Sequence, residues 1–269
     1  MNMYILFDIG GTHMRVALSR DGKTISAGPI IVPTPQLFDD GVARFTDIAR
    51  KLLGGGKCIA AAGGVAGPFN HDKKVFTHAP HIPDWAGKPI AQKFSDALGG
   101  VPLHFENDAA LAALAEARRG AGKGHEIVAY ITIGTGVGGA RVEGGHIDRN
   151  AFGFEPGHQI IEGSNMRLED LIGGKALEAR YNKRPLEIND ARVWDEVAEK
   201  LSYALVNTIL YWSPNIIVLG GAISRKIPLD KVQHMTQKLL AGSSEMPVIV
   251  LSHFADSSGI EGAIELLAP

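Results

Sequence analysis

The stretch YILFDIGGTH, residues 4–13, is an apolar run that ends in an aspartate and a pair of glycines. Apolar residues without helical spacing, closed by glycines, predict a buried strand that turns sharply. The apolar run at residues 127–133 ends in a second glycine-rich turn, at residues 134–139. Because glycine lets the backbone reverse and leaves its N–H groups open to an anion, both turns are candidate phosphate-binding loops.

The patterns around these two runs repeat the same order of elements. After the first run they predict strands at 14–18, 25–32, 58–65 and 102–105, a hairpin at 67–76, and helices at 37–53, at 88–98 and from 109 to Gly120. After the second run they predict strands at 139–142, 216–219 and 248–251, and helices at 193–212, at 229–240 and from 259 onward. This repetition predicts two related α/β lobes, with a ligand cleft between them.

Composition argues against several classes of protein. The 269 residues include 27 Lys and Arg against 29 Asp and Glu, so the net charge of −2 offers no basic excess for nucleic acid. The single cysteine, Cys58, rules out an intrachain disulfide, and its apolar neighbours predict a buried core thiol. The N-terminus has no basic leader, and no apolar run approaches the ~18 residues of a membrane span, so we expect a cytoplasmic protein.

Three glycine turns carry candidate chemistry. The turn IGTGVGG, residues 133–139, has the spacing of a dinucleotide-binding loop, but residues 140–143 alternate like a strand, so a hairpin is predicted instead. A third turn, VLGGAIS at 218–224, suits the base and ribose of a nucleotide. Asp8, before the first turn, has the ligand chemistry that Mg²⁺ prefers. The alternative for the first turn is an ordinary glycine hairpin with a surface aspartate.

The motifs DIGGTH, GVAGP, FENDAALAALAE, IGTGVGG, EPGH and VLGGAIS follow one another across residues 4–265. In this order they resemble the ROK family of sugar kinases, within the actin-like ATPase and hexokinase superfamily. The resemblance implies an α/β, two-lobed actin-like ATPase (ribonuclease H-like) fold with a cleft between the lobes. We expect a small lobe over 1–108, completed by a C-terminal helix at 255–269, and a large lobe over 109–254.

The resemblance also implies a site for ATP and Mg²⁺. The first two turns would bind phosphates through Gly10, Gly11, Thr12, Gly134, Thr135 and Gly136. The third would bind adenosine through Gly220 and Gly221, and Asp8 would act on Mg²⁺ through water.

A sugar site is implied in the same way. Asp108 would be the general base, Asn107 would hold a sugar hydroxyl, and the backbone of Gly64 and Gly67 would form the floor of the site. Glu155, His158 and Glu169 would bind further hydroxyls, with Glu169 in a Leu-Glu step before a helix. From the residues alone, Asp108 is better explained as the N-cap of the Ala-rich helix. The alternative for the other three is a solvated loop.

This chain departs from the family pattern at several positions. Most members have a zinc site made of the EPGH-type histidine and three cysteines, but residues 159–168 contain no cysteine, so we predict no zinc. That feature is similar to the polyphosphate glucokinases. His13 stands where many members have lysine; Arg15 either supplies the missing charge or is a surface residue. Trp85 either lines the site or packs in the core.

The leading interpretation is an ATP-dependent hexose kinase that phosphorylates a hydroxymethyl group, with glucose as the first candidate. Alternatives are an N-acetylhexosamine kinase, a fructokinase, a polyphosphate-dependent glucokinase, or a catalytically silent sugar-binding protein. A sugar-responsive repressor of the family would need a DNA-binding module ahead of the first strand, for which we expect no room. The partners expected are a sugar, a nucleotide and a second copy of the chain, without nucleic acid or membrane.

Overall fold

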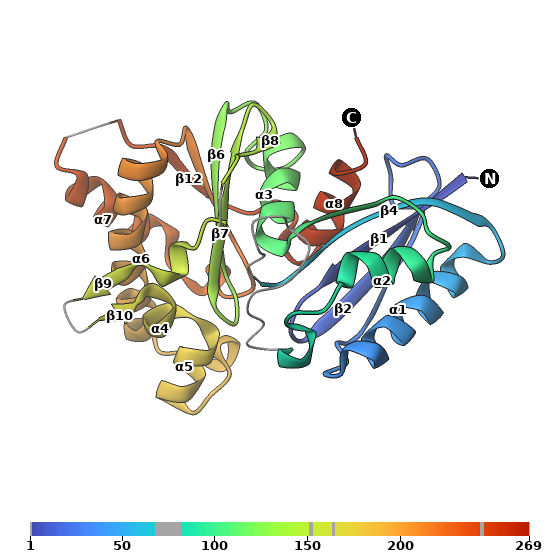
Figure 1. Ribbon diagram of the computed structural model, residues 1–269. Helices are drawn as coiled ribbons and strands as arrows, with labels where there is room; N and C mark the ends of the chain where they lie inside the picture. The colour runs from blue at the N-terminus through green and yellow to red at the C-terminus, as the bar shows by residue number, and fades with distance from the viewer. Residues whose placement is uncertain (1, 68–81, 151–152, 163–164, 243–244, 269) are drawn as a thin grey trace. The chain divides into compact units, whose positions relative to one another are not determined.

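The computed structural model describes residues 2–67, 82–150, 153–162, 165–242 and 245–268 (Figure 1). The chain forms two compact units. Unit 1 comprises Met1–Ala115, Asn150–Gly153 and Ser257–Pro269, and unit 2 comprises Glu116–Arg149 and Phe154–Asp256. Most of the hairpin predicted at 67–76 lies outside the described residues.

Unit 1 is built on a five-stranded sheet in the order β3-β2-β1-β4-β5. Its strands are β1 (Asn2–Ile9), β2 (His13–Ser19), β3 (Ala27–Pro33), β4 (Lys57–Val65) and β5 (Leu103–Asn107). The first three are antiparallel neighbours, whereas β4 and β5 run parallel to β1. The predicted strands at the start of the chain are therefore confirmed, and the glycine turn at 10–12 joins β1 to β2.

Alternate residues of β1 enter two different cores. Phe7 packs in one core with Phe45 of helix α1 (Phe38–Leu53) and Phe94 of α2 (Ile90–Ala97), and the rings of Phe45 and Phe94 stack with centroids 4.1 Å apart. Leu6 packs in the other, with helix α3 (Asp108–Arg118) and the C-terminal helix α8 (Ser258–Glu265). Asp8, two residues after Leu6, thus faces α8.

The structure of unit 1 decides the role of Trp85 and confirms the prediction for Cys58. Trp85, in the 3₁₀ turn η1 (Pro83–Trp85), is fully buried, and its indole N–H donates to the carbonyl of Pro35 at 3.1 Å. It therefore packs in the core and does not line a site. Cys58 is buried as predicted, and burial raises the pKa of its thiol.

Unit 2 repeats the sheet of unit 1 in the order β12-β11-β6-β7-β8. Its strands are β6 (Ile127–Ile133), β7 (Val137–Glu143), β8 (His146–Ile147), β11 (Ile216–Gly220) and β12 (Val248–Leu251). Again three strands, β6, β7 and β8, are antiparallel neighbours, and β11 and β12 run parallel to β6. This pattern confirms the internal repetition. It also confirms the hairpin at 133–139, because the glycine turn leads into strand β7 and not into the helix that a dinucleotide-binding loop requires.

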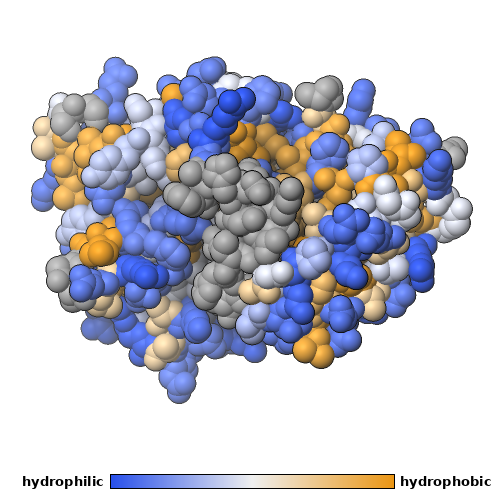
Figure 2. All heavy atoms as spheres, in the orientation of Figure 1, coloured by the Kyte–Doolittle hydropathy of each residue, from blue (hydrophilic) through white to orange (hydrophobic). Residues whose placement is uncertain are grey.

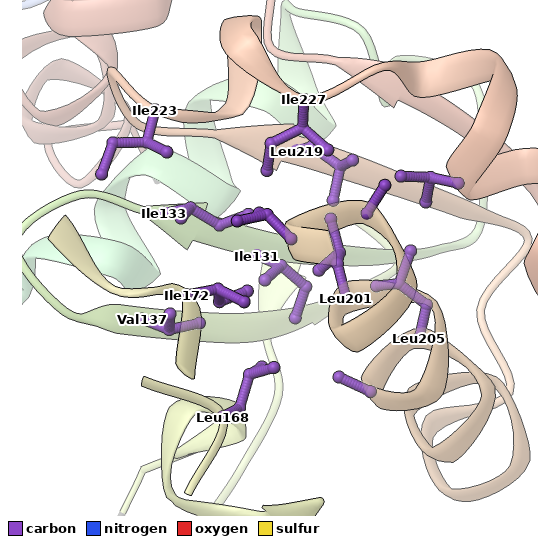
Figure 3. Close-up of a cluster of buried hydrophobic side chains, with 14 of the residues drawn as sticks. Ile131, Ile133, Val137, Leu168, Ile172, Leu201, Leu205, Leu219, Ile223 and Ile227 are labelled. Atoms are coloured by element: carbon purple, nitrogen blue, oxygen red, sulfur yellow. The ribbon is translucent and has the colours of Figure 1, made fainter. Parts of the chain in front are cut away.

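The core of unit 2 lies between this sheet and its helices (Figure 3). Ile131 and Ile133 of β6 share the core with Leu201 and Leu205 of α6 (Ala191–Trp212), and α7 (Leu229–Leu240) packs beside α6. A small sheet of β9 (Ile160–Glu162) and β10 (Met166–Arg167) precedes two short helices, α4 (Leu168–Ile172) and α5 (Gly174–Tyr181). The sequence analysis predicts no helix at the position of α5.

The surface mixes polar and apolar side chains. On the face drawn in Figure 2, hydrophilic residues are interspersed with small hydrophobic groups. Among the helices that the structure describes, none combines the length and the apolar character required to cross a membrane.

Candidate active site

The first glycine turn is held by its own backbone and by Thr34. The N–H of Gly10 donates to the carbonyl of His13 at 2.9 Å, and the Thr34 hydroxyl donates to the carbonyl of Gly10 at 2.7 Å. Thr34 also donates its N–H to the carbonyl of Thr12 at 3.0 Å. Thr12 and His13 are exposed, while Gly10 and Gly11 are half-buried. The turn is therefore fixed on its inner side and open on its outer side.

Asp8 stands at the end of β1, directly opposite Arg15 of β2 in the strand register. Its side chain is buried, and Nη1 of Arg15 lies 3.2 Å from Oδ2 of Asp8. Burial raises the pKa of the Asp8 carboxyl, while the charge and the hydrogen bond of Arg15 oppose that rise. The alternative of a surface aspartate is wrong, because the side chain is buried, and Arg15 is a partner of Asp8, not an isolated surface residue.

The surroundings of Asp8 fit a magnesium ion held through water. Mg²⁺ is usually bound by one or two carboxylates together with water and substrate phosphates, not by a cage of protein ligands. Within the described ranges there is no group of three or more His, Cys, Asp or Glu able to hold a metal. A single desolvated carboxylate, only partly neutralised by Arg15, is a group whose charge a divalent cation would stabilise.

Asn107, and not Asp108, caps helix α3. Oδ1 of Asn107 accepts hydrogen bonds from the N–H groups of Ala109 at 2.9 Å and Ala110 at 3.3 Å. Its Nδ2 donates to the carbonyl of Gly67 at 3.1 Å. Asp108 is the first residue of the helix, and its Oδ1 accepts from the N–H of Ala109 at 2.8 Å. The interpretation of Asp108 as the N-cap is therefore wrong, since the preceding side chain already fills that role.

Gly64 lets β4 pass close beneath this helix end. A Cβ at position 64 would lie 2.7 Å from Cδ1 of Leu111 and 3.3 Å from Cα of Asp108. Gly67 has a φ of 144°, in the region that favours glycine. Both predicted glycines thus adjoin the Asn107–Asp108 pair, one under the helix and the other bonded to Asn107.

The second and third glycine turns lie side by side in unit 2. The N–H groups of Gly174 and Lys175, at the start of α5, donate to the carbonyls of Gly134 and Thr135 at 2.8 and 3.0 Å. Gly221 has a φ of 84°, and a Cβ there would lie 2.3 Å from the carbonyl oxygen of Ile133. Only glycine permits the backbone at position 221 to come this close to Ile133. The end of β11 therefore lies against the end of β6, and Gly220 and Gly221 lie next to Gly134–Gly136.

Glu155, His158 and Glu169 come together beside the second turn. Nε2 of His158 lies 3.2 Å from Oε1 of Glu169, and a Cβ at Gly136 would lie 2.8 Å from the other carboxylate oxygen of Glu169. Gly157, in the 3₁₀ turn η2 (Pro156–His158), packs on β7 so closely that a Cβ would meet the carbonyl of Val137 at 2.0 Å. Glu169 lies inside α4 and not merely before a helix.

The charge of Glu155 depends on these neighbours. Although Glu155 is exposed, nearby atoms remove water from part of its carboxyl group and raise its pKa from the ordinary value. The charge of His158 lowers the pKa of Glu155, and the charge of Glu169 raises it. The carboxyl of Glu155 thus lies close enough to His158 and Glu169 to feel the charge of each.

Two further polar residues escaped the sequence analysis. Glu116 of α3 is fully buried and accepts hydrogen bonds from the hydroxyl of Ser252 at 2.6 Å and from the N–H groups of Phe254, Ala121 and His253. An acidic residue inside an Ala/Leu-rich helix was the available signal. Gln159 donates to the carbonyl of Pro156 at 2.8 Å and accepts from the amide of Asn207 at 2.9 Å. No local sequence pattern around Gln159 indicates these two hydrogen bonds.

The chain is similar to known proteins along almost its whole length. A family model described as "ROK family" matches residues 4–269. A glucokinase from Streptomyces coelicolor is 27% identical to the chain, in an alignment that covers 99% of the chain and 98% of the relative.

Solved structures give the same result. A ROK hexokinase from Thermus thermophilus matches with a TM-score of 0.84 at 27% identity, over 98% of this chain and 97% of that one. A ROK family glucokinase from Streptomyces griseus, in complex with glucose and AMPPNP, matches with a TM-score of 0.80 at 25% identity, over 98% of each chain. These neighbours have the actin-like ATPase fold, so the predicted fold class is confirmed.

Proposed function

The chain belongs to the ROK family, and on this basis we propose that it is a sugar kinase that transfers the γ-phosphate of ATP to the hydroxymethyl group of a hexose. Glucose is the first candidate, because the relative from Streptomyces coelicolor is named a glucokinase and the Streptomyces griseus structure holds glucose with a nucleotide analogue.

The observation that carries the proposal is that Asn107 caps α3, which leaves Asp108 available for another role. Since Asn107 caps α3, the carboxylate of Asp108 is not needed to begin the helix. Asp108 lies in the first turn of α3, where the positive end of the helix dipole interacts favourably with a carboxylate. In the proposal, Asp108 accepts the proton of the attacking hydroxyl, a step that contributes roughly 10²- to 10⁴-fold to such reactions.

Asn107, Gly64 and Gly67 surround this base in unit 1 and hold the sugar next to it. The amide of Asn107 is already oriented by its bonds to the helix and to Gly67, so it presents a fixed polar group to a sugar hydroxyl. In unit 2, Glu155, His158 and Glu169 take further hydroxyls, for which carboxylates and an imidazole are suitable acceptors and donors.

The glycine turns hold the nucleotide. Gly10, Gly11 and Thr12 in unit 1 and Gly134, Thr135 and Gly136 in unit 2 bind phosphates, while Gly220 and Gly221 border the adenosine. Bound Mg²⁺ supplies neutralisation of the charge on the phosphate oxygens. Asp8 would hold this ion through water, and Arg15 keeps the Asp8 carboxylate in place through its bond at 3.2 Å.

A phosphorylation screen tests the proposal. The protein is assayed with glucose, fructose and N-acetylhexosamines, each with ATP and with polyphosphate as donor. We expect one hexose to be phosphorylated at its hydroxymethyl group with ATP. Phosphorylation of another sugar, or use of polyphosphate, would redirect the proposal within the sugar kinases; no phosphorylation of any sugar would leave a sugar-binding protein.

The matched pair of variants is Asp108→Asn and Asp230→Asn. Both replace an aspartate in the first turn of a helix, but Asp230 lies in the first turn of α7, outside the candidate site. Asp108→Asn should lower kcat by roughly 10²- to 10⁴-fold while sugar binding, measured by calorimetry, persists. Asp230→Asn should leave kcat unchanged. An unchanged kcat in Asp108→Asn would exclude the proposed base.

A further inference from the structure

The C-terminal helix α8 reaches the carboxylate of Asp8 through a glycine. Helix α8 packs against β1, β2 and β4 on the face of the unit 1 sheet to which Leu6 and Asp8 point. A Cβ at Gly259 would lie 2.5 Å from Cγ of Asp8 and 2.6 and 2.8 Å from its two oxygens. The three atoms nearest to such a Cβ therefore all belong to one carboxylate group.

The other sides of this carboxylate are also defined by the fold. In the strand register, Arg15 of β2 flanks Asp8 on one side and Gly64 of β4 flanks it on the other. Arg15 bonds Oδ2 at 3.2 Å, and Gly64 contributes no side chain. The backbone of α8 at Gly259 closes the remaining flank, so that only 8% of Asp8 is exposed. The carboxylate is thus confined by a cation, a strand and a helix.

We infer that Gly259 is a positioning residue for Asp8, so that the C-terminal helix belongs to the machinery that holds the metal-bound nucleotide. The inference rests on the proposed function for the role of Asp8 and on the geometry for the role of Gly259. A methyl group at position 259 overlaps the carboxylate and must displace it or push α8 away from β1. Displacement of a reacting group by about 1 Å can lower a rate by about 10²-fold.

The packing of α8 makes displacement of Asp8 the expected outcome. Gly262, one turn further along, brings α8 against the backbone of α3, where a Cβ would meet the carbonyl oxygen of Leu111 at 2.0 Å. Ile260, Ala263 and Ile264 are buried in the same core. Because α8 is held by this backbone approach and by its apolar face, the side chain of Asp8 is the part that yields.

A thermodynamic cycle tests the geometry without any assay of activity. Gly259→Ala is made in the natural chain and in Asp8→Ala and Asp8→Asn backgrounds, and the melting temperature of each protein is measured. We expect Gly259→Ala to lower the melting temperature in the natural chain and in the Asp8→Asn background, which keeps an overlapping group of the same size. In the Asp8→Ala background this loss should disappear, because alanine is otherwise a better helix residue than glycine.

The control is Gly41→Ala in α1. A Cβ there would meet the ring of Trp85 at 2.2 Å, in the core that contains Phe7 and not in the one that contains Leu6. Its effect on the melting temperature should be the same in all three backgrounds. The inference is overturned if Gly259→Ala leaves the natural chain as stable as before, or if its cost persists undiminished in the Asp8→Ala background.

The kinetic arm separates this inference from the proposed function. In Gly259→Ala we expect kcat to fall about 10²-fold and the Mg²⁺ concentration for half-maximal rate to rise, with KM for the sugar unchanged. A loss of kcat accompanied by an equal change in sugar KM, and no change in Mg²⁺ dependence, would contradict the positioning role. If the natural protein phosphorylates no sugar, the proposed function fails, whereas the melting cycle still decides whether Gly259 positions Asp8.

Discussion

Nε2 of His158 lies 3.2 Å from Oε1 of Glu169, and the backbone of Gly136 lies against the other oxygen of the same carboxylate. Glu169 therefore connects the proposed sugar-binding histidine to the proposed phosphate-binding turn within unit 2. The pair is only partly buried, with 47% of the histidine side chain and 28% of the glutamate side chain exposed. Such a pair contributes little to folding stability, so its loss should affect ligand binding more than unfolding.

Glu169→Gln should raise KM for the sugar by roughly 10- to 10²-fold, since loss of a hydrogen bond to a charged group costs roughly 1.5–3 kcal/mol. The melting temperature should change little. Steady-state kinetics and thermal unfolding on the same preparation measure both. Glu178→Gln, an exposed glutamate on neighbouring α5, is the control and should change neither. A large loss of stability with an unchanged KM would show that Glu169 is structural.

The raised pKa of Glu155 predicts how stability depends on pH. A carboxyl whose pKa is higher in the folded state binds more protons when folded, so stability falls as pH rises through that pKa. Glu155→Gln removes this loss. The melting temperature of Glu155→Gln, relative to the natural protein, should therefore increase between about pH 4 and about pH 7. Glu187→Gln, an exposed glutamate in the turn η3 (Pro185–Glu187), is the control. A difference that is constant or decreasing over this range would contradict the prediction.

Asn107→Ala should affect both folding and sugar binding. Loss of an N-cap costs about 1 kcal/mol, which urea unfolding can measure. The matched control is Asp190→Ala, which removes the cap of α6, where Asp190 accepts from the N–H of Arg192. Both variants should lose similar stability, but only Asn107→Ala should raise KM for the sugar. Equal kinetics in the two variants would argue against a sugar contact at Asn107.

Glu116 should be among the residues on which folding depends most. Its buried carboxylate accepts from a hydroxyl and several backbone N–H groups that have been removed from water. Glu116→Ala leaves these donors unsatisfied and should lower the free energy of unfolding by about 3 kcal/mol. Glu126→Ala, just before β6, is the surface control. A cost below about 1 kcal/mol for Glu116→Ala would show that water replaces the carboxylate.

Treatment with a zinc chelator should change neither the stability nor the activity of this protein, because we predict no zinc site. The side chain of Gln159 already ties the turn at Pro156 to Asn207 of α6, and its backbone carbonyl accepts from the N–H of Leu168, so the segment around His158 is held by amide hydrogen bonds. After treatment with a chelator and return of Mg²⁺ alone, the melting temperature and the rate should equal those of untreated protein. Elemental analysis provides the independent measurement. Recovery only on addition of zinc would contradict the prediction.

Much of the fold was readable because its signals are local. Apolar runs that end in glycine pairs predicted the strands and turns of both units, and their repetition predicted two related sheets. The short helices α4 and α5 were harder, since five and eight residues with little amphipathic pattern depend on packing for their stability. Candidate residues such as Glu155, His158 and Glu169 came from the resemblance, and their assembly beside Gly136 came from the fold.

The sequence by itself determined which residue types stand at the ends of which strands, because strand periodicity and glycine turns depend on neighbours along the chain. Only the tertiary structure decided that Asn107 donates to the carbonyl of Gly67, that Asp8 is buried against Arg15, and that Gly259 confines the same carboxylate. Each of these depends on the distance between atoms of different elements, in the last case 251 positions apart (259 − 8) in the chain. Such distances arise from packing, which no window of the sequence contains.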